Sequence, residues 1–317
     1  MAKRIFFGIS KLAISAALLY WVLRDLDIEA IVQHLSEANQ VWLAIAFLMF
    51  FIGYLITALR WRMLLRAYGS SARITYLVQS FMVGIFFNNL LPSTIGGDAV
   101  RMYDTWRLGN SKSGAASVVL VDRLMGLLAL TAYSLVTVFF ASELIQSVTT
   151  LPLLVLGATS ILTILAWIIF LAPRTSLERI ASLSEMIWPG LGRITTKITS
   201  ALSAFHGRKA LLLRAFGLSL LLQLNVIIHF IIVTRAMGID VPPVAMFTII
   251  PLSILLMMLP VTINGIGLRE SVFVFFLGAY GVSANEAVAF AWVALGFVII
   301  QGGLGGIVFL MRREARV

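Results

Sequence analysis

Residues 91–98 have the sequence LPSTIGGD and residues 259–267 have the sequence LPVTINGIG, and each run interrupts an apolar stretch. The two runs match without a gap when the chain is offset by 168 residues, in a pattern LPxTIxGxxxR that ends at Arg101 and Arg269. Proline and glycine are the residues that break helices and permit tight turns. The chain has only 8 prolines, so we interpret the match as an internal repeat and not as a coincidence between two broken helices.

The composition around these runs is that of an integral membrane protein. Of the 317 residues, 60% are hydrophobic and 12% are charged, about half of the charged fraction usual in a soluble protein. The absence of cysteine excludes disulfides, thiolate catalysis and Cys-ligated metals, and the three histidines are scattered. We therefore expect no metal, no cofactor and no long soluble catalytic domain.

Apolar length predicts the membrane topology, since a spanning helix needs about 20 residues. Lys and Arg collect in cytoplasmic loops, and they stay on one side only if the segments 74–108 and 244–280 enter and leave by the same face. The sequence predicts an all-α polytopic protein of the cytoplasmic (inner) membrane, with one transmembrane domain over 1–317 and both termini cytoplasmic. It has two re-entrant hairpins, related as an inverted repeat, and six full spans at 5–23, 41–59, 113–141, 151–172, 210–234 and 287–311.

The net charge of +10 follows from this orientation, so no nucleic acid partner is expected. Arg60 and most other basic residues of the loops are then cytoplasmic, and only Arg24 and Arg235 lie outside. The segment 174–209 predicts an amphipathic connector on the cytoplasmic interface, and a regulatory or partner-binding role is its alternative. Its apolar face contains Ile194, Ile198, Leu202 and Phe205.

Six ionisable residues fall at membrane depth, and their charges sum to zero: Asp98, Arg101, Asp122, Arg123, Arg269 and Glu270. Adjacent residues on a helix do not face each other. Asp122 should therefore pair with Arg101 or Arg269, and Arg123 with Asp98 or Glu270. Two interpretations follow: the pairs lock the fold, or some of them open to bind a charged head group.

Inverted repeats with broken helices are typical of a transporter site near the bilayer midplane. The returning helices present free backbone N–H groups, and Arg101 and Arg269 would approach one central site from opposite faces. The polar and glycine residues at the turns could bind a phosphate or a glycerol, and they could equally cap their own helices. They are Asn88, Asn89, Thr94, Gly96, Gly97, Thr262, Asn264 and Gly265.

Two motifs are similar to those of a known family. The run N-x-x-P-x-x-x-GGD-x-x-R from Asn89 to Arg101 and the pair Asp122-Arg123-x-x-Gly126 are supported by P-x-x-x-x-G-x-G-x-RE from Pro260 to Glu270. With these motifs the chain resembles the flippase-like family typified by the transmembrane region of lysylphosphatidylglycerol synthase. The resemblance implies a lipid-translocating module, with phospholipid, hopanoid or polyprenyl phosphate as the substrate class. Lipid aminoacylation is not expected, because the chain ends at Val317 without the soluble transferase domain.

We therefore predict a flippase or scramblase that moves a lipid with an anionic phosphate head group. The substrate site combines the six ionisable residues with the eight turn residues above. The alternative is a membrane-embedded enzyme that acts on a lipid phosphate; it would need a nucleophile or base beside its acid group. No histidine lies near Asp98 or Asp122 in the sequence, so we expect a protein that is not an enzyme. Its partners are membrane lipid and, in this role, enzymes of lipid biosynthesis.

Overall fold

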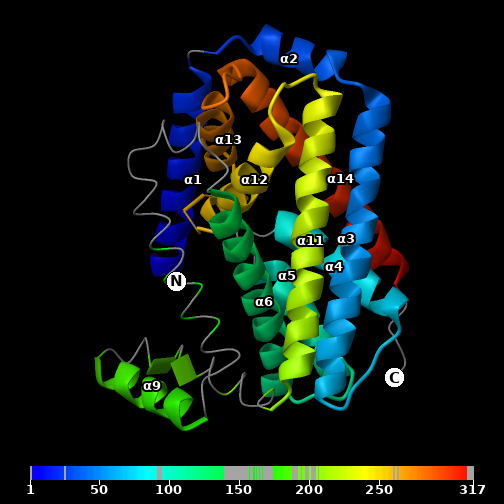
Figure 1. The fold of residues 1–317 in the computed structure, drawn as a ribbon, viewed down its shortest axis with the longest axis vertical. Coiled ribbons are helices and arrows are strands. Elements are labelled where there is room, and N and C mark those ends of the chain that lie inside the picture. The colour runs from blue at the N-terminus through cyan, green and yellow to red at the C-terminus, as the bar shows by residue number, and fades with distance from the viewer. Residues whose placement is uncertain are drawn as a thin grey trace.

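The computed structural model describes residues 2–24, 26–90, 95–138, 174–187, 207–259, 261–262 and 264–312, together with single positions or pairs between 157 and 205. Within these residues all secondary structure is helical and there is no β-strand (Figure 1). The predicted all-α fold class is confirmed. Most of the predicted span 151–172 and much of the connector after residue 187 lie outside the described residues.

The described helices follow one another along most of the chain. In chain order they are α1 (Ala2–Leu23), α2 (Ile28–Glu37), α3 (Gln40–Ala67), α4 (Ile74–Leu90), α5 (Ile95–Arg107), α6 (Lys112–Val138), α9 (Arg174–Ile187), α11 (Lys209–Ala236), α12 (Pro243–Met257), α13 (Leu268–Gly278) and α14 (Ala284–Met311).

Four of the described helices, α3, α6, α11 and α14, are long and apolar enough to cross a membrane. Three of them, α3, α11 and α14, contain 28 residues each. At 1.5 Å per residue this is about 42 Å of helix, which exceeds a hydrocarbon core of about 30 Å. α3 and α11 pack side by side in opposite directions along the bundle (Figure 1). These lengths and compositions identify a multi-pass membrane protein.

Two antiparallel pairs of shorter helices turn back near the middle of the bundle. The outer ends of α12 and α13 lie at the upper end in Figure 1, where α2 lies, whereas the outer ends of α4 and α5 lead to the opposite, lower end. Gly84 and Gly97 permit the close approach of α4 and α5, because a Cβ on Gly97 would lie 2.9 Å from the Gly84 carbonyl oxygen. In each pair the chain thus changes direction near the middle of the bundle.

The offset of 168 residues relates whole helices and not only the motif. Adding 168 to the bounds of α3, α4, α5 and α6 gives 208–235, 242–258, 263–275 and 280–306, within five residues of the bounds of α11, α12, α13 and α14. α4 packs against α14 as α12 packs against α6, and α5 packs against α6 as α13 packs against α14. The two helices of each corresponding pair run in opposite directions (Figure 1).

The core lies in two main clusters, one in each half of the bundle. The upper cluster surrounds Ile249, Phe273 and Phe290, and the lower one surrounds Trp61 and Met125.

Phe205 is fully buried in the lower cluster, with its ring centroid 5.5 Å from that of Tyr68. This residue of the apolar face predicted for the connector is therefore part of the bundle core. The other three residues of that predicted face lie outside the described residues.

Helix α2 is absent from the sequence prediction, although its capping signal is present. The Asp27 carboxylate accepts hydrogen bonds from the N–H groups of Glu29 and Ala30 at 2.9 and 3.2 Å. Asn39 then caps the start of α3 in the same way. Ile31 of α2 is buried in a small cluster with Val288 of α14, so α2 covers the upper end of the bundle.

The helix that contains the second predicted span extends beyond residue 59. It continues to Ala67 and buries Arg60 with 5% of its surface exposed. The charge of Arg60 is therefore satisfied by an ion pair inside the bundle.

Candidate functional site

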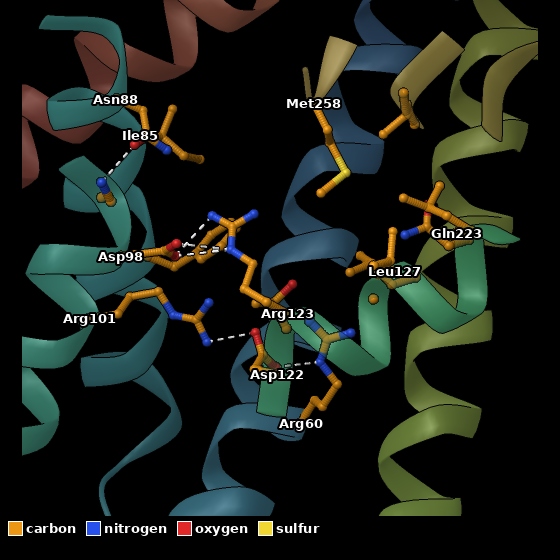
Figure 2. A pocket seen from close by; sticks show the side chains of 18 residues that line it. Arg60, Ile85, Asn88, Asp98, Arg101, Asp122, Arg123, Leu127, Gln223 and Met258 are labelled. Carbon is orange, nitrogen blue, oxygen red and sulfur yellow. Dashed lines mark hydrogen bonds and ion pairs between the residues drawn. The ribbon is translucent and has the colours of Figure 1, made fainter. Parts of the chain in front are cut away.

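A cavity of about 320 Å³ lies inside the bundle, among α3, α4, α5, α6 and α11, with the end of α12 on its upper side (Figure 2). One part of its lining is apolar, including Phe81, Ile85, Leu127, Leu130, Leu222, Ile254 and Met258. The other part is polar and consists of Thr57, Arg60, Asn88, Asp98, Arg101, Asp122, Arg123 and Gln223. Three arginines and two aspartates leave the lining with a net charge of +1.

Asp122 of α6 holds two buried arginines at the lower side of this cavity. Its Oδ1 lies 2.6 Å from Nε of Arg60 on α3, and its Oδ2 lies 2.8 Å from Nη2 of Arg101 on α5. Asp122 has 2% of its side chain exposed, and the two arginines have 6% and 5%. One carboxylate therefore joins three helices in a cluster with a net charge of +1.

Neighbouring groups fix the geometry of the two arginines. Arg60 donates a hydrogen bond from Nη1 to Ser219 Oγ on α11 at 2.6 Å. The Arg101 guanidinium lies over the Trp61 ring at 4.7 Å, and Trp61 Nε1 donates to Thr105 Oγ1 at 3.2 Å. Contacts of this kind desolvate and orient a cation without neutralising it.

Arg123 and Asp98 form a second ion pair that opens into the cavity (Figure 2). Arg123 Nη2 lies 2.9 Å from Asp98 Oδ1, and Arg123 Nε lies 3.1 Å from each carboxylate oxygen. The side chains are 45% and 23% exposed. This pair has the forked geometry with which arginine also binds phosphate, and it is far more accessible than the Asp122 cluster.

The pairing predicted from the helical periodicity is confirmed for four of the six ionisable residues. Asp122 and Arg123 are adjacent on α6 and reach different partners, Arg101 and Asp98, on α5.

The prediction that cross-pairing satisfies all six is wrong for Arg269 and Glu270. Glu270 Oε2 accepts the Gly267 N–H at 2.8 Å, and Arg269 Nη2 donates to the Asn264 carbonyl oxygen at 3.1 Å. Both side chains form hydrogen bonds with backbone groups of their own turn, so neither pairs with a charged residue of α6.

At the first turn the polar residues divide between the cavity and the helix packing. Asn88 lines the cavity, and its Oδ1 accepts the Gly97 N–H at 2.6 Å, so it also caps α5. Asn89 donates to the Val298 carbonyl oxygen of α14 at 2.7 Å and does not line the cavity. Gly97 lines the cavity and Gly96 does not. Thr94 lies outside the described residues.

At the second turn the predicted site residues form a tight, left-handed backbone. Asn264 and Gly265 have φ angles of 52° and 77°. Arg269 is buried, and its Nη1 has no hydrogen-bond partner among the described residues. Thr262 is also buried. None of the described predicted residues of this turn lines the cavity; the second repeat contributes Leu222 and Gln223 of α11 and apolar residues at the end of α12.

The charged residues of the cavity therefore all belong to the first repeat, and the second repeat contributes the polar side chain of Gln223. At the offset of 168, the positions of Arg60, Asp122 and Arg123 are occupied by Ile228, Phe290 and Ala291. Arg101 thus keeps a carboxylate partner, whereas its counterpart Arg269 has none among the described residues.

Arg60 and Asp104 are buried charged residues that are not among the predicted site residues. Asp104 of α5 is 4% exposed, accepts a hydrogen bond from Ser80 Oγ and pairs with Arg312 Nη1 at 2.8 Å. The signal for Arg60 is the run Leu59 to Leu65, which continues the helical pattern past the first arginine. No comparable local signal marks Asp104, because its partner lies 208 residues away.

A family model described as the transmembrane region of lysylphosphatidylglycerol synthase matches residues 8–305, which include the whole cavity. The chain belongs to this family. The resemblance inferred from the two motifs is confirmed, and it covers most of the helices described above.

The chain is also similar to three proteins that are each described as a UPF0104 membrane protein. The Methanothermobacter thermautotrophicus protein is 26% identical over 281 residues, which cover 80% of each chain. The Methanocaldococcus jannaschii protein is 21% identical over 292 residues, 88% of this chain and 86% of that one. The Pyrococcus horikoshii protein is 26% identical over 184 residues, 57% of this chain, and the match spans about half (52%) of that protein. No solved structure shows a significant match to this chain.

Proposed function

We propose that the protein moves a lipid with an anionic phosphate head group between the two leaflets, without changing it covalently. The observation that carries this proposal is the Arg123–Asp98 pair, a forked ion pair that is partly exposed inside an amphipathic cavity at mid-depth. A phosphate offers arginine the same two parallel acceptor oxygens as a carboxylate. A head group can therefore replace Asp98 at Arg123 without leaving the guanidinium desolvated and alone.

The Asp122 cluster supports this role by holding a fixed positive charge next to the exchangeable pair. Arg60 and Arg101 share one carboxylate, so the cluster retains one net positive charge. In a medium of low dielectric this charge attracts a phosphate strongly. The buried arginines stay in place because each is held by a second group, Ser219 or Trp61.

The apolar lining suits the part of the lipid next to the phosphate. Leu127 and Met258 lie across the cavity from Asp98 and Arg101 in Figure 2, and Leu222 also lines it. A glycerol backbone or the first part of a chain would contact these side chains while the phosphate contacts Arg123. The proposed substrate class is a phospholipid or a polyprenyl phosphate.

We propose that the membrane topology is the predicted one, with six spans and re-entrant hairpins at 74–108 and 244–280. The correspondence of α3–α6 with α11–α14 in opposite directions supports an inverted repeat, the arrangement typical of alternating-access transporters. Basic side chains follow the lower ends of the helices, as Arg66, Arg73, Arg107, Lys112 and Lys209 do, and acidic ones the upper ends, as Asp27, Glu29, Asp240 and Glu286 do. The positive-inside rule then makes the lower end and both termini cytoplasmic.

The experiment is reconstitution of the purified chain into liposomes that contain a trace of head-group-labelled phosphatidylglycerol or polyprenyl phosphate. A membrane-impermeant reductant reports the fraction of label in the outer leaflet over time. We expect wild type to equilibrate the label and Arg123→Gln to abolish this. Arg66→Gln removes an exposed arginine outside the cavity and should retain wild-type rates.

Two outcomes would overturn the proposal. One is full activity of a folded Arg123→Gln protein. The other is chemical conversion of the lipid, detected by mass spectrometry of the extracted lipids, which would favour the enzyme alternative.

A further inference from the structure

A second hollow lies on the opposite side of α5, between the α4–α5 pair and the C-terminal end of α14. Its volume is about 490 Å³. We name it the α5 groove and define it by Phe87, Val100 and Phe309, towards mid-depth, and by Tyr76, Arg107 and Arg312, towards the lower end. It shares no lining residue with the cavity of the Arg123–Asp98 pair.

Helix α5 separates the two hollows because its two faces carry different residues. Asp98 and Arg101 face the cavity, whereas Ala99, Val100, Tyr103 and Arg107 face the α5 groove. The groove residues recur at intervals of three and four, the spacing of one helical face. The groove is therefore a feature of its own and not a branch of the cavity.

Charge is concentrated at the lower end of the α5 groove. Arg312 Nη1 pairs with Asp104 at 2.8 Å, and its guanidinium lies 4.4 Å from the centre of the Tyr76 ring. Arg107, in the last turn of α5, adds a second cation, 5.9 Å from the Tyr103 ring. Two arginines and one aspartate leave the groove with a net charge of +1, so the lower end is suited to an anion.

The upper part of the groove is apolar and has the depth of one leaflet. Lining residues extend along α5 from Gly96 to Arg107, a distance of 11 residues or about 16 Å at 1.5 Å per residue. Half of a hydrocarbon core of about 30 Å is about 15 Å. A chain anchored at Arg107 would therefore reach mid-depth beside Val100 and Phe309.

We propose that the α5 groove binds one anionic lipid of the lower leaflet, with its phosphate at Arg107 and Arg312 and one acyl chain along α5. This site is separate from the proposed translocation cavity, and its occupancy does not require that the protein transport anything. The occupant is a lipid and not a soluble anion, because an anion alone leaves the apolar part of the groove unfilled.

The absence of native cysteine makes a direct binding assay possible. Ala99 is exposed and lines the groove, so Ala99→Cys introduces a single thiol there, and Leu221→Cys places a control thiol on an exposed position of α11. The rate of maleimide labelling is measured in detergent as phosphatidylglycerol, phosphatidylcholine or glycerol 3-phosphate is added. We expect phosphatidylglycerol to slow labelling at position 99 at least fivefold and to leave position 221 unchanged.

The charge requirement is tested by adding Arg107→Gln or Arg312→Gln to the Ala99→Cys protein, with Arg66→Gln as the matched control at the same end of the bundle. The proposal is supported if phosphatidylglycerol no longer protects the thiol in the Arg107→Gln and Arg312→Gln proteins but still protects it in the Arg66→Gln protein. Equal protection by phosphatidylcholine, equal slowing at position 221, or protection by glycerol 3-phosphate alone would each overturn it. The assay measures binding and not transport. A protein that binds lipid in the groove but does not transport it, or that transports lipid with an empty groove, therefore separates this proposal from the proposed function.

Discussion

Arg123 on α6 contacts both carboxylate oxygens of Asp98 on α5, at distances of 2.9 and 3.1 Å. Asp122, the residue directly before Arg123, is buried in a different cluster with Arg60 and Arg101. Two adjacent residues thus take part in one accessible pair and one buried cluster, and these should respond differently to mutation.

The buried cluster should dominate stability. Asp122→Asn leaves two buried arginines without a carboxylate and should cost about 3 to 5 kcal/mol, the range for breaking a buried ion pair. Asp98→Asn breaks a partly exposed pair and should cost only about 0.2 to 1 kcal/mol. Melting temperatures of the two variants in the same detergent check the order. Equal losses of stability in the two variants would contradict the expectation that the buried cluster contributes more to stability than the exposed pair.

The planar guanidinium of Arg123, and not only its charge, should determine the transport rate. Arg123→Lys keeps the cation but loses the planar pair of donors, so we expect a transport rate between those of wild type and Arg123→Gln. The melting temperatures should stay within a few degrees of wild type, because the pair is partly exposed. A lysine variant that transports as fast as wild type would contradict bidentate binding.

Substitution of Arg269 should affect lipid binding less than substitution of Arg101, although the two positions match in the repeat. Because Arg269 does not line the cavity, Arg269→Gln should leave stabilisation of the protein by added anionic lipid unchanged, whereas Arg101→Gln should reduce it. The shift in melting temperature on lipid addition measures this difference. Equal losses of the lipid-induced shift would favour the original prediction of one central site shared by both arginines.

Glycine packing between α14 and α4 offers a matched pair of substitutions. A Cβ on Gly305 would overlap the Met82 carbonyl oxygen, whereas a Cβ on Gly303 would meet nothing within 4 Å. Gly305→Ala should therefore destabilise the protein by about 1 to 3 kcal/mol. Gly303→Ala should be neutral or stabilise by up to about 1 kcal/mol, because alanine favours the helix. Thermal unfolding of both variants tests this, and a stable Gly305→Ala protein would contradict the close packing.

The hairpin topology predicts which positions label from which side. Single cysteines at Lys112 and Lys209, at the lower ends of α6 and α11, should react with an impermeant maleimide only from the cytoplasmic side. Cysteines at Glu29 and Asp240 should react only from the outside. Labelling of Lys112 or Lys209 from the outside only would exclude the arrangement in which 74–108 enters and leaves by one face.

The sequence alone determined the features that depend on local pattern. The membrane class follows from apolar length, the helix breaks follow from proline and glycine, and the repeat follows from a motif whose offset also relates α3 to α11. The different partners of Asp122 and Arg123 follow from the 3.6-residue period, since adjacent residues cannot face the same neighbour.

Only the tertiary structure decided which half of the repeat carries the polar site. Arg101 and Arg269 are equivalent in the motif, but Arg101 meets Asp122 and Arg269 meets a backbone carbonyl. Arg60 reaches the same aspartate across 62 residues, and Arg312 reaches Asp104 across 208. The burial of each of these charges depends on the packing of helices distant in the chain, and no local pattern contains that information.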